Sequence, residues 1–286
     1  MGMMDGKLCI VTGATSGIGF CTAMEIAQMG GSVIIMGRNQ PKCITAMKII
    51  QEETRNPSVE YLLADLSSQT QIRAAARLFY EKHDQLDVLV NNAGGFFLRR
   101  KLSVDGIEMT LALNYLAHFL LTNLFLDALK KSPSARVINV SSNTHRKMHL
   151  DFNDLQLRKF YNPVQAYGRS KLASLLFSYA LARRLADFRI TSNALSPGWV
   201  ATEIYKKINP WLTPLIYPVF QRIGQTPMEG AQTSIYLATS PDVEGITGKY
   251  YESKRLIRSS TASYDLESAR RLWELSSELV GLGNAG

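Results

Sequence analysis

Cysteine is scarce in this sequence of 286 residues, and long apolar runs are missing from it. The three cysteines, Cys9, Cys21 and Cys43, show neither metal-ligand spacing nor the even count of a disulfide framework, so we expect a reducing, cytoplasmic location. No stretch reaches about 18 apolar residues without a charged or amide side chain, and the first strand-like run begins at Lys7. We therefore expect no membrane span, signal peptide or N-terminal anchor.

Long blocks of like charge are also absent, although the net charge is +8. Basic residues are scattered in pairs, as at Arg99-Arg100 and Lys206-Lys207, which is not typical of a nucleic-acid-binding surface. An anionic cofactor, or a weak attraction to acidic membrane surfaces, would account for the excess. His145 and His149 lie four residues apart without a third ligand at a sensible spacing, so we expect no bound metal.

Short β-branched runs alternate with longer helical patterns along the whole chain. Strands separated by helices require crossover connections, which produce a mostly parallel sheet with helices on both faces. We therefore predict a single α/β domain, 1–286, of the doubly wound Rossmann type with a seven-stranded sheet. The expected strands are 8–12, 33–36, 59–64, 86–90, 136–141, 190–195 and 248–251.

One region breaks this alternation. Pro210, Pro214 and Pro218 deny backbone donors and interrupt any long helix there. We expect an irregular apolar flap over the substrate at 203–224. Weak peripheral contact with a membrane is expected through the same flap, because Trp211 and Tyr217 accompany Lys206 and Lys207.

The sequence T-G-A-T-S-G-I-G follows the first strand directly and opens the first helix. Gly13, Gly17 and Gly19 let the backbone turn tightly and approach a pyrophosphate, which a helix N-terminus attracts. The spacing is G-x-x-x-G-x-G and not G-x-G-x-x-G, and a plain strand-to-helix turn is the alternative. In a dinucleotide site the contacting residues would also include Thr15, Ser16 and Ile18.

The end of the second strand discriminates between the two nicotinamide cofactors. Sites that prefer NAD place an acidic residue there to hold the ribose 2′-hydroxyl, whereas this chain has Arg38 and Asn39. A guanidinium without a carboxylate would pair with a 2′-phosphate, so NADP(H) is favoured over NAD(H). A solvated arginine at a strand end is the alternative.

Two further loops belong to the expected cofactor site. Asp65-Leu66 closes the third strand and is expected to flank the adenine. Asn92, Ala93 and Gly94 follow the fourth strand, where small residues permit close approach of the cofactor. Either motif alone is more typical of ordinary loop chemistry.

Tyr167 and Lys171 lie four residues apart in A-Y-G-R-S-K, so on a helix both face the same way. A phenol with a pKa of about 10 is a poor base at neutral pH, but a nearby ammonium favours the phenolate, which lets Tyr167 act as acid and base. Ser142, at the end of the fifth strand, is expected to hydrogen-bond the substrate oxygen as negative charge develops on it. Ser141 points to the opposite face if the strand stays regular.

These motifs, together with Asn114 in A-L-N-Y-L and the segment S-P-G-W-V-A-T, resemble the short-chain dehydrogenase/reductase family over nearly the whole chain. The resemblance implies that Asn114 supports a water-linked proton relay to Lys171, whose ammonium also binds the nicotinamide ribose, as does Tyr167. It further implies a homodimer in which the long helices 106–131 and 163–187 pair between subunits. The residues it assigns to the nicotinamide end are Pro197, Gly198, Val200 and Thr202.

Segments such as L-N-Y-L-A-H-F-L-L-T and A-R-R-L-W-E-L-S are similar to the retinol dehydrogenase-like branch of that family. The expected function is hydride transfer between NADP(H) and a hydrophobic alcohol, aldehyde or ketone, such as a retinoid, lipid, steroid or polyketide. A non-catalytic nucleotide sensor or scaffold on the same fold is the alternative, as is an epimerase or ene-reductase. His118 lies on the long apolar helix, and we expect it to be a hydrogen-bonded structural residue.

Overall fold

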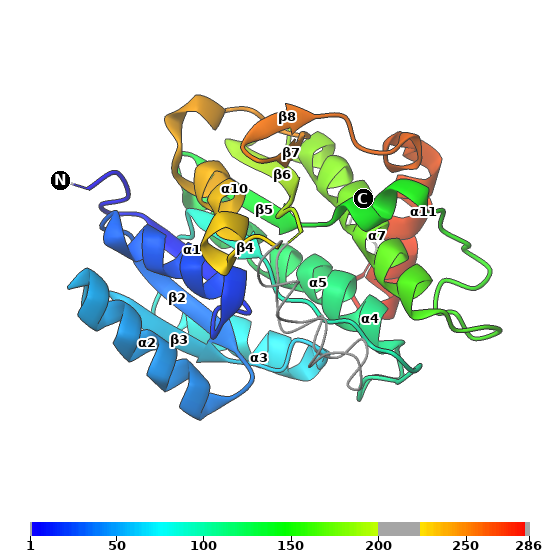
Figure 1. Cartoon of the computed structure of the whole chain (residues 1–286), viewed down its shortest axis with the longest axis horizontal. Coiled ribbons are helices and arrows are strands. Elements are labelled where there is room, and N and C mark those ends of the chain that lie inside the picture. Colours follow the sequence, from blue (N-terminus) through cyan, green and yellow to red (C-terminus); the bar gives the residue numbers. More distant parts are fainter. Residues whose placement is uncertain (1, 200–223, 284–286) are drawn as a thin grey trace.

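The computed structural model describes residues 2–199 and 224–283, which form one sheet covered by helices on both faces (Figure 1). The strand order is β3-β2-β1-β4-β5-β6-β7-β8, and all pairs are parallel except β7 with β8. The order reverses between β1 and β4, which is where ligands bind in doubly wound folds. The strands are β1 Leu8–Thr12, β2 Ser32–Gly37, β3 Val59–Leu63, β4 Val88–Asn91, β5 Ala135–Val140, β6 Ile190–Ser196, β7 Tyr250–Glu252 and β8 Arg255–Ile257.

Two hydrophobic clusters, one on each face of the sheet, hold the layers together. The first face carries α1 (Gly17–Gln28), α2 (Gln40–Thr54) and α10 (Pro227–Thr239). The opposite face carries α3 (Gln69–Tyr80), α5 (Ala117–Leu124), α6 (Leu126–Lys131) and α7 (Pro163–Arg184), with α11 (Leu266–Leu279) outside them. In β1, Cys9 and Val11 belong to one cluster and Ile10 to the other, so the strand is apolar on both sides.

The sheet has eight strands, so the expected count of seven is wrong. The additional strand, β8, returns antiparallel to β7, with Tyr250 opposite Ile257. The two residues between these strands, Ser253 and Lys254, have positive φ values of 50° and 62°, as a tight two-residue hairpin requires. Ser-Lys is not a sequence typical of such a turn, which is why the strand was not predicted.

The long helix expected over 106–131 is interrupted twice. It consists of α4 (Met109–Leu111), a π-helical turn at Ala112–Leu116, and then α5 and α6, which are separated at Phe125. π-Helical turns of this kind are frequent at functional sites. Here the turn contains Asn114.

The C-terminal helix α11 packs across α5 and α7. The Trp273 ring lies 5.0 Å from Phe119 and 5.8 Å from Phe177 between centroids, and the hydroxyls of Tyr115 and Ser276 are 2.7 Å apart. The face through which the family resemblance implies subunit pairing is therefore covered by this chain's own helix.

Most of the predicted flap, 203–223, lies outside the described residues. Among the helices that the structure does describe, none has the length and apolar character needed to cross a bilayer.

Candidate active site

The glycine-rich turn after β1 has the backbone that a phosphate cradle needs. Gly13 and Gly17 have φ values of 65° and 60°, which side chains disfavour. A Cβ atom at Gly19 would lie 2.5 Å from Asn92 Nδ2 and 2.6 Å from the carbonyl oxygen of Gly13. Only glycine fits there, and the close packing brings the start of α1 against the loop after β4.

The N-terminus of α1 is open to an anion. Ser16 occupies the N-cap position, but its side chain makes no capping hydrogen bond. The first N–H groups of a helix have no partner within the helix, so they and the helix dipole are suited to a pyrophosphate. Thr15 and Ile18 flank this turn, and the residues present fit the diphosphate of a dinucleotide.

Thr12 joins the glycine-rich turn to the loop after β4, a contact that no sequence motif predicts. Its buried hydroxyl accepts hydrogen bonds from the backbone N–H groups of Asn92 (2.9 Å) and Ala93 (3.0 Å) and donates one to the Val90 carbonyl (3.2 Å). Asn92 Nδ2 in turn donates to the Thr12 carbonyl at 2.8 Å. The threonine that opens T-G-A-T-S-G-I-G therefore fixes the loop Asn92–Gly94.

Arg38 and Asn39 differ in what they do. Gly13 N donates to the Met36 carbonyl at 2.8 Å, so the end of β2 borders the glycine-rich turn and Arg38 projects from that border, exposed to solvent. The Asn39 side chain caps α2 by accepting a hydrogen bond from Lys42 N at 3.0 Å. Arg38 therefore supplies a positive charge beside the cradle, while the side-chain oxygen of Asn39 is engaged in capping α2.

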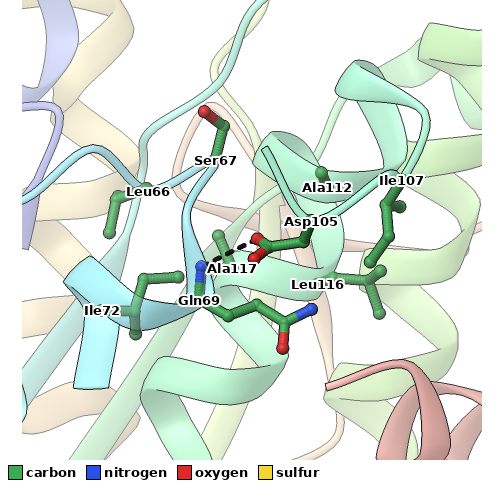
Figure 2. A pocket seen from close by; sticks show the side chains of 9 residues that line it. All are labelled: Leu66, Ser67, Gln69, Ile72, Asp105, Ile107, Ala112, Leu116 and Ala117. Atoms are coloured by element: carbon green, nitrogen blue, oxygen red, sulfur yellow. Dashed lines mark hydrogen bonds between the residues drawn. The ribbon is translucent and has the colours of Figure 1, made fainter. Parts of the chain in front are cut away.

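Leu66 points into the protein. Its side chain lines a small pocket together with Ile72 and Leu116 (Figure 2). The free volume of this pocket, about 10 Å³, is no larger than a single water molecule needs. The Asp65 carboxylate accepts hydrogen bonds from the backbone N–H (2.9 Å) and hydroxyl (2.7 Å) of Ser67. Only the half-buried Asp65 and the backbone of this loop remain for contact with an adenine.

Lys171 and Asn114 meet in the interior beside Gly94. The Lys171 ammonium, only 3% exposed as a residue, donates to the Val140 carbonyl at 2.8 Å. Asn114 Oδ1 accepts from Gly95 N at 2.8 Å, while its Nδ2 donates to the Gly95 carbonyl at 3.0 Å. A Cβ atom on Gly94 would touch both Asn114 Oδ1 (3.4 Å) and Lys171 Nζ (3.7 Å). The loop after β4 thus lies directly over these two side chains.

Tyr167 lies at the mouth of this cluster. The Lys171 ammonium is 5.6 Å from the centroid of the Tyr167 ring. The Phe96 ring also lies beside Tyr167, with 5.7 Å between the two ring centroids. Burial lowers the pKa of Lys171 to about 8, because the charged form is poorly solvated in the interior. At neutral pH the ammonium nevertheless stays mostly charged.

Ser141 and Ser142 point in different directions, as a regular strand requires. The Ser141 hydroxyl is buried and donates to the Lys171 carbonyl at 2.9 Å, so it anchors α7. The half-buried Ser142 hydroxyl accepts from Thr144 N at 3.3 Å and begins a short 3₁₀ turn at the end of β5. Ser142 is therefore the serine available at the carboxyl edge of the sheet.

Among residues 2–199 and 224–283, no group of three or more His, Cys, Asp or Glu side chains lies close enough together to hold a metal ion. His145 is buried and structural, with Nδ1 at 2.6 Å from the Ser142 carbonyl and Nε2 accepting from Ser260 N at 3.1 Å. His118 is buried too; a hydrogen bond with the backbone of Ala93 acts on its pKa, although neither ring nitrogen has a partner of good geometry within the described part of the chain. Burial and the Lys171 charge lower its pKa to about 3, so the imidazole is neutral.

At the end of β6 the structure describes Pro197 and Gly198 but not Val200 or Thr202, which lie outside the described residues. Gly198 has a φ of 81°, and its N–H donates to the Ser196 hydroxyl at 3.3 Å. The chain turns sharply there, at the same edge as Ser142.

An open glycine cradle at the switch point of a doubly wound sheet, with a buried lysine and a tyrosine beside it, is the arrangement of a nicotinamide-dependent oxidoreductase. The family model for short chain dehydrogenase matches residues 7–213. The chain belongs to the short-chain dehydrogenase/reductase family, in its retinol dehydrogenase-like branch.

Three relatives illustrate the similarity. Polyprenol dehydrogenase of Homo sapiens is 43% identical over 96% of this chain and 86% of its own length. Retinol dehydrogenase 13 of Mus musculus is 43% identical over 99% of this chain and 86% of its own length. A solved structure, the RhlG/NADP active-site complex of Pseudomonas aeruginosa, is 27% identical with a TM-score of 0.69, covering 87% of this chain and 95% of that one.

Proposed function

We propose that this oxidoreductase transfers hydride between NADP(H) and a hydrophobic alcohol, aldehyde or ketone, with Tyr167 as general acid and base. The observation that carries the proposal is the buried Lys171 ammonium, held by the Val140 carbonyl and facing the Tyr167 ring beside the glycine cradle. Few structural roles justify an ammonium buried in this way, because its desolvation is costly.

The glycine-rich turn at the N-terminus of α1, with Arg38 beside it and no carboxylate at the end of β2, suits NADP(H). Bound there, the nicotinamide supplies or accepts the hydride. The pyrophosphate is assigned to the turn from Gly13 to Gly19, the 2′-phosphate to Arg38, and the remaining contacts to the loops after β3, β4 and β6. The residues proposed to hold it are Gly13, Thr15, Ser16, Gly17, Ile18, Gly19, Arg38, Asn39, Asp65, Leu66, Asn92, Ala93, Gly94, Tyr167, Lys171, Pro197, Gly198, Val200 and Thr202.

In the direction of reduction, Tyr167 donates its hydroxyl proton to the substrate oxygen, and Ser142 stabilises the charge that develops on that oxygen. The Lys171 ammonium stabilises the resulting phenolate. The π-helical turn places Asn114 so that its amide braces Gly95 and Ser170, at 3.2 Å from the Ser170 hydroxyl. We assign it to the proton relay that restores Tyr167 after turnover.

The preference for NADP(H) rests on charge. The end of β2 carries Arg38 and no carboxylate, and an exposed guanidinium at the rim of the cradle can form a bidentate pair with a phosphate. That the RhlG structure is an NADP complex supports the same assignment.

For the substrate, the two curated relatives are named for retinol and polyprenol, both apolar alcohols. Phe96 beside Tyr167 supplies an apolar wall at the reacting centre. Phe160, in contrast, is 73% exposed.

Replacing Tyr167 by Phe tests the mechanism. Turnover of an apolar carbonyl by NADPH should fall by at least about a hundredfold, as loss of a general acid does, while NADPH binding persists. Tyr236→Phe on α10 is the matched control and should retain activity. Sustained turnover by Tyr167→Phe would show the assigned mechanism to be wrong. If wild type bound NADPH but turned over none of a panel of retinoid, polyprenoid, steroid and fatty carbonyls, a sensor or scaffold would be favoured.

A further inference from the structure

Two loops beside the candidate active site expose several large apolar side chains. In the loop after Phe97, Val104 is 82% exposed, and Leu98 and Leu102 are exposed as well. In the segment that leads into α7, Phe160 is 73% exposed and Val164 is also exposed. We call 98–104 and 158–164 together the basic apolar patch. Clustered exposed apolar groups usually mark a contact surface.

The two loops form one surface. The Tyr161 hydroxyl donates to the Phe97 carbonyl at 2.7 Å, and Arg100 Nε donates to the Gln156 carbonyl at 3.3 Å. The first loop is also held to the body of the protein, because Asp105 Oδ2 accepts from Gln69 N at 2.9 Å (Figure 2). Both loops leave the body on the side of α4 and the start of α7 (Figure 1).

The charge of this surface has one sign. The patch carries Arg99, Arg100, Lys101, Arg158 and Lys159 and has no acidic residue, so five positive charges of a chain with net charge +8 are gathered here. The nearest carboxylates are engaged by backbone amides. Asp154 accepts from the N–H groups of Arg158 and Lys159 at 2.7 and 3.1 Å, and Asp105 from Gln69.

We propose that the basic apolar patch docks the enzyme on the surface of a bilayer that contains anionic lipid. Apolar side chains would enter the interface between headgroups and acyl chains while the arginines and lysines pair with lipid phosphates and carboxylates. A plain polyanion would use the charges but would gain nothing from Val104 and Leu102.

The basic apolar patch lies next to Tyr167, so docking would bring the reacting centre close to the bilayer. Phe96, which packs on Tyr167, leads directly into the patch, and Val164 lies one helical turn before Tyr167 on α7. An apolar substrate, as the proposed function requires, concentrates in the bilayer. The reacting centre would then open towards the phase that holds its substrate.

The first test is sedimentation of the full chain with vesicles of phosphatidylcholine alone and of phosphatidylcholine with about one third phosphatidylserine. We expect binding to the anionic vesicles that weakens as salt rises, since exposed charges are screened over about 8 Å at physiological ionic strength. No binding to the anionic vesicles at low salt would overturn the proposal.

Charge-reversal variants locate the contact. Arg99→Glu with Lys101→Glu should weaken binding to the anionic vesicles by at least about tenfold, since each basic residue near such a surface contributes on the order of a fivefold factor. Lys48→Glu with Lys249→Glu makes the same change in net charge at exposed positions elsewhere and should weaken it by less than about threefold. Equal losses in both pairs would contradict a local docking surface.

Apolar variants separate a bilayer from any other polyanion. Val104→Ser with Phe160→Ser should weaken vesicle binding several-fold, whereas the exposed control pair Leu256→Ser with Leu266→Ser should not. If Val104→Ser with Phe160→Ser bound as tightly as wild type, the bilayer proposal would be wrong. Turnover of a short, water-soluble carbonyl without vesicles reports on the proposed function separately, and the patch variants should retain it.

Discussion

Replacing Thr12 by Val tests whether one buried hydroxyl holds the two cofactor loops together. The substitution keeps the shape of the side chain but removes the acceptor for Asn92 N and Ala93 N and the donor to the Val90 carbonyl. Ala93 N would lose its acceptor, whereas Asn92 N also donates to the Val90 carbonyl at 3.0 Å and would keep that partner. A buried N–H left without a partner costs about 1–3 kcal/mol, so the free energy of unfolding should fall by about 1–3 kcal/mol. Urea denaturation measures this, and NADPH affinity should fall as the loop loosens.

Thr22→Val is the matched control for that experiment. Thr22 is equally buried, but its hydroxyl only donates to the Ile18 carbonyl within α1, at 2.8 Å. Its removal strands no N–H group, so we expect a loss of about 1 kcal/mol or less. If the two variants lost the same stability, Thr12 would have no special role and the reasoning would fail.

Buried side chains also determine how the stability depends on pH and which surfaces are free for a second subunit. Burial lowers the pKa of Lys171 from 10.5 in the unfolded chain to about 8 in the folded one. Between these two pH values the unfolded chain binds more protons than the folded chain, so stability rises with pH there. The cost of burying the ammonium, about 3 kcal/mol, is therefore present in full below about pH 8 and is relieved as the pH rises. Lys171→Met should therefore gain stability relative to wild type at about pH 7, and this gain should shrink by on the order of 2 kcal/mol by about pH 10; a gain independent of pH would refute the assignment. Because α11 covers α5 and α7 through Trp273, we expect light scattering to give the mass of a single chain, 31.9 kDa, and a dimer cross-linked through α7 would contradict this.

The central strands were predictable because both faces of the sheet are buried. A strand such as β1, with Ile10 facing one helix layer and its neighbours the other, appears in the sequence as an uninterrupted apolar run between turn residues. β8 could not be found in this way, since it is a short edge strand that is mostly exposed. Its turn also uses Ser253 and Lys254 at positive φ, where glycine or asparagine would be expected.

In the candidate site, too, some residues could be predicted from local sequence patterns and others could not. Gly13, Gly17, Tyr167 and Lys171 carry their chemistry in residue type and spacing, so local patterns reveal them. The role of Thr12 depends on Asn92 and Ala93, about 80 residues away, and the pattern T-G-x-x-x-G-x-G does not report that contact. The π-helical turn around Asn114 was likewise invisible, because its apolar pattern is that of an ordinary helix.

The sequence also does not predict which surface the C-terminal helix α11 covers. The amphipathic pattern of α11 indicates a helix that packs on an apolar surface, but it does not say which one. Only the structure shows Trp273 between Phe119 and Phe177 and Ser276 against Tyr115. The family resemblance alone had suggested that this surface meets a second subunit.

The central claim, an NADP(H)-dependent oxidoreductase, is tested most directly by thermal unfolding of wild type, Arg38→Ala and the control Arg255→Ala with NADPH or NADH. At a fixed ligand concentration, a ligand that binds the native state more tightly raises the unfolding temperature further. We predict a larger rise with NADPH than with NADH for wild type and Arg255→Ala, and loss of that difference in Arg38→Ala. Equal stabilisation of wild type by both cofactors, or by neither, would contradict the assignment.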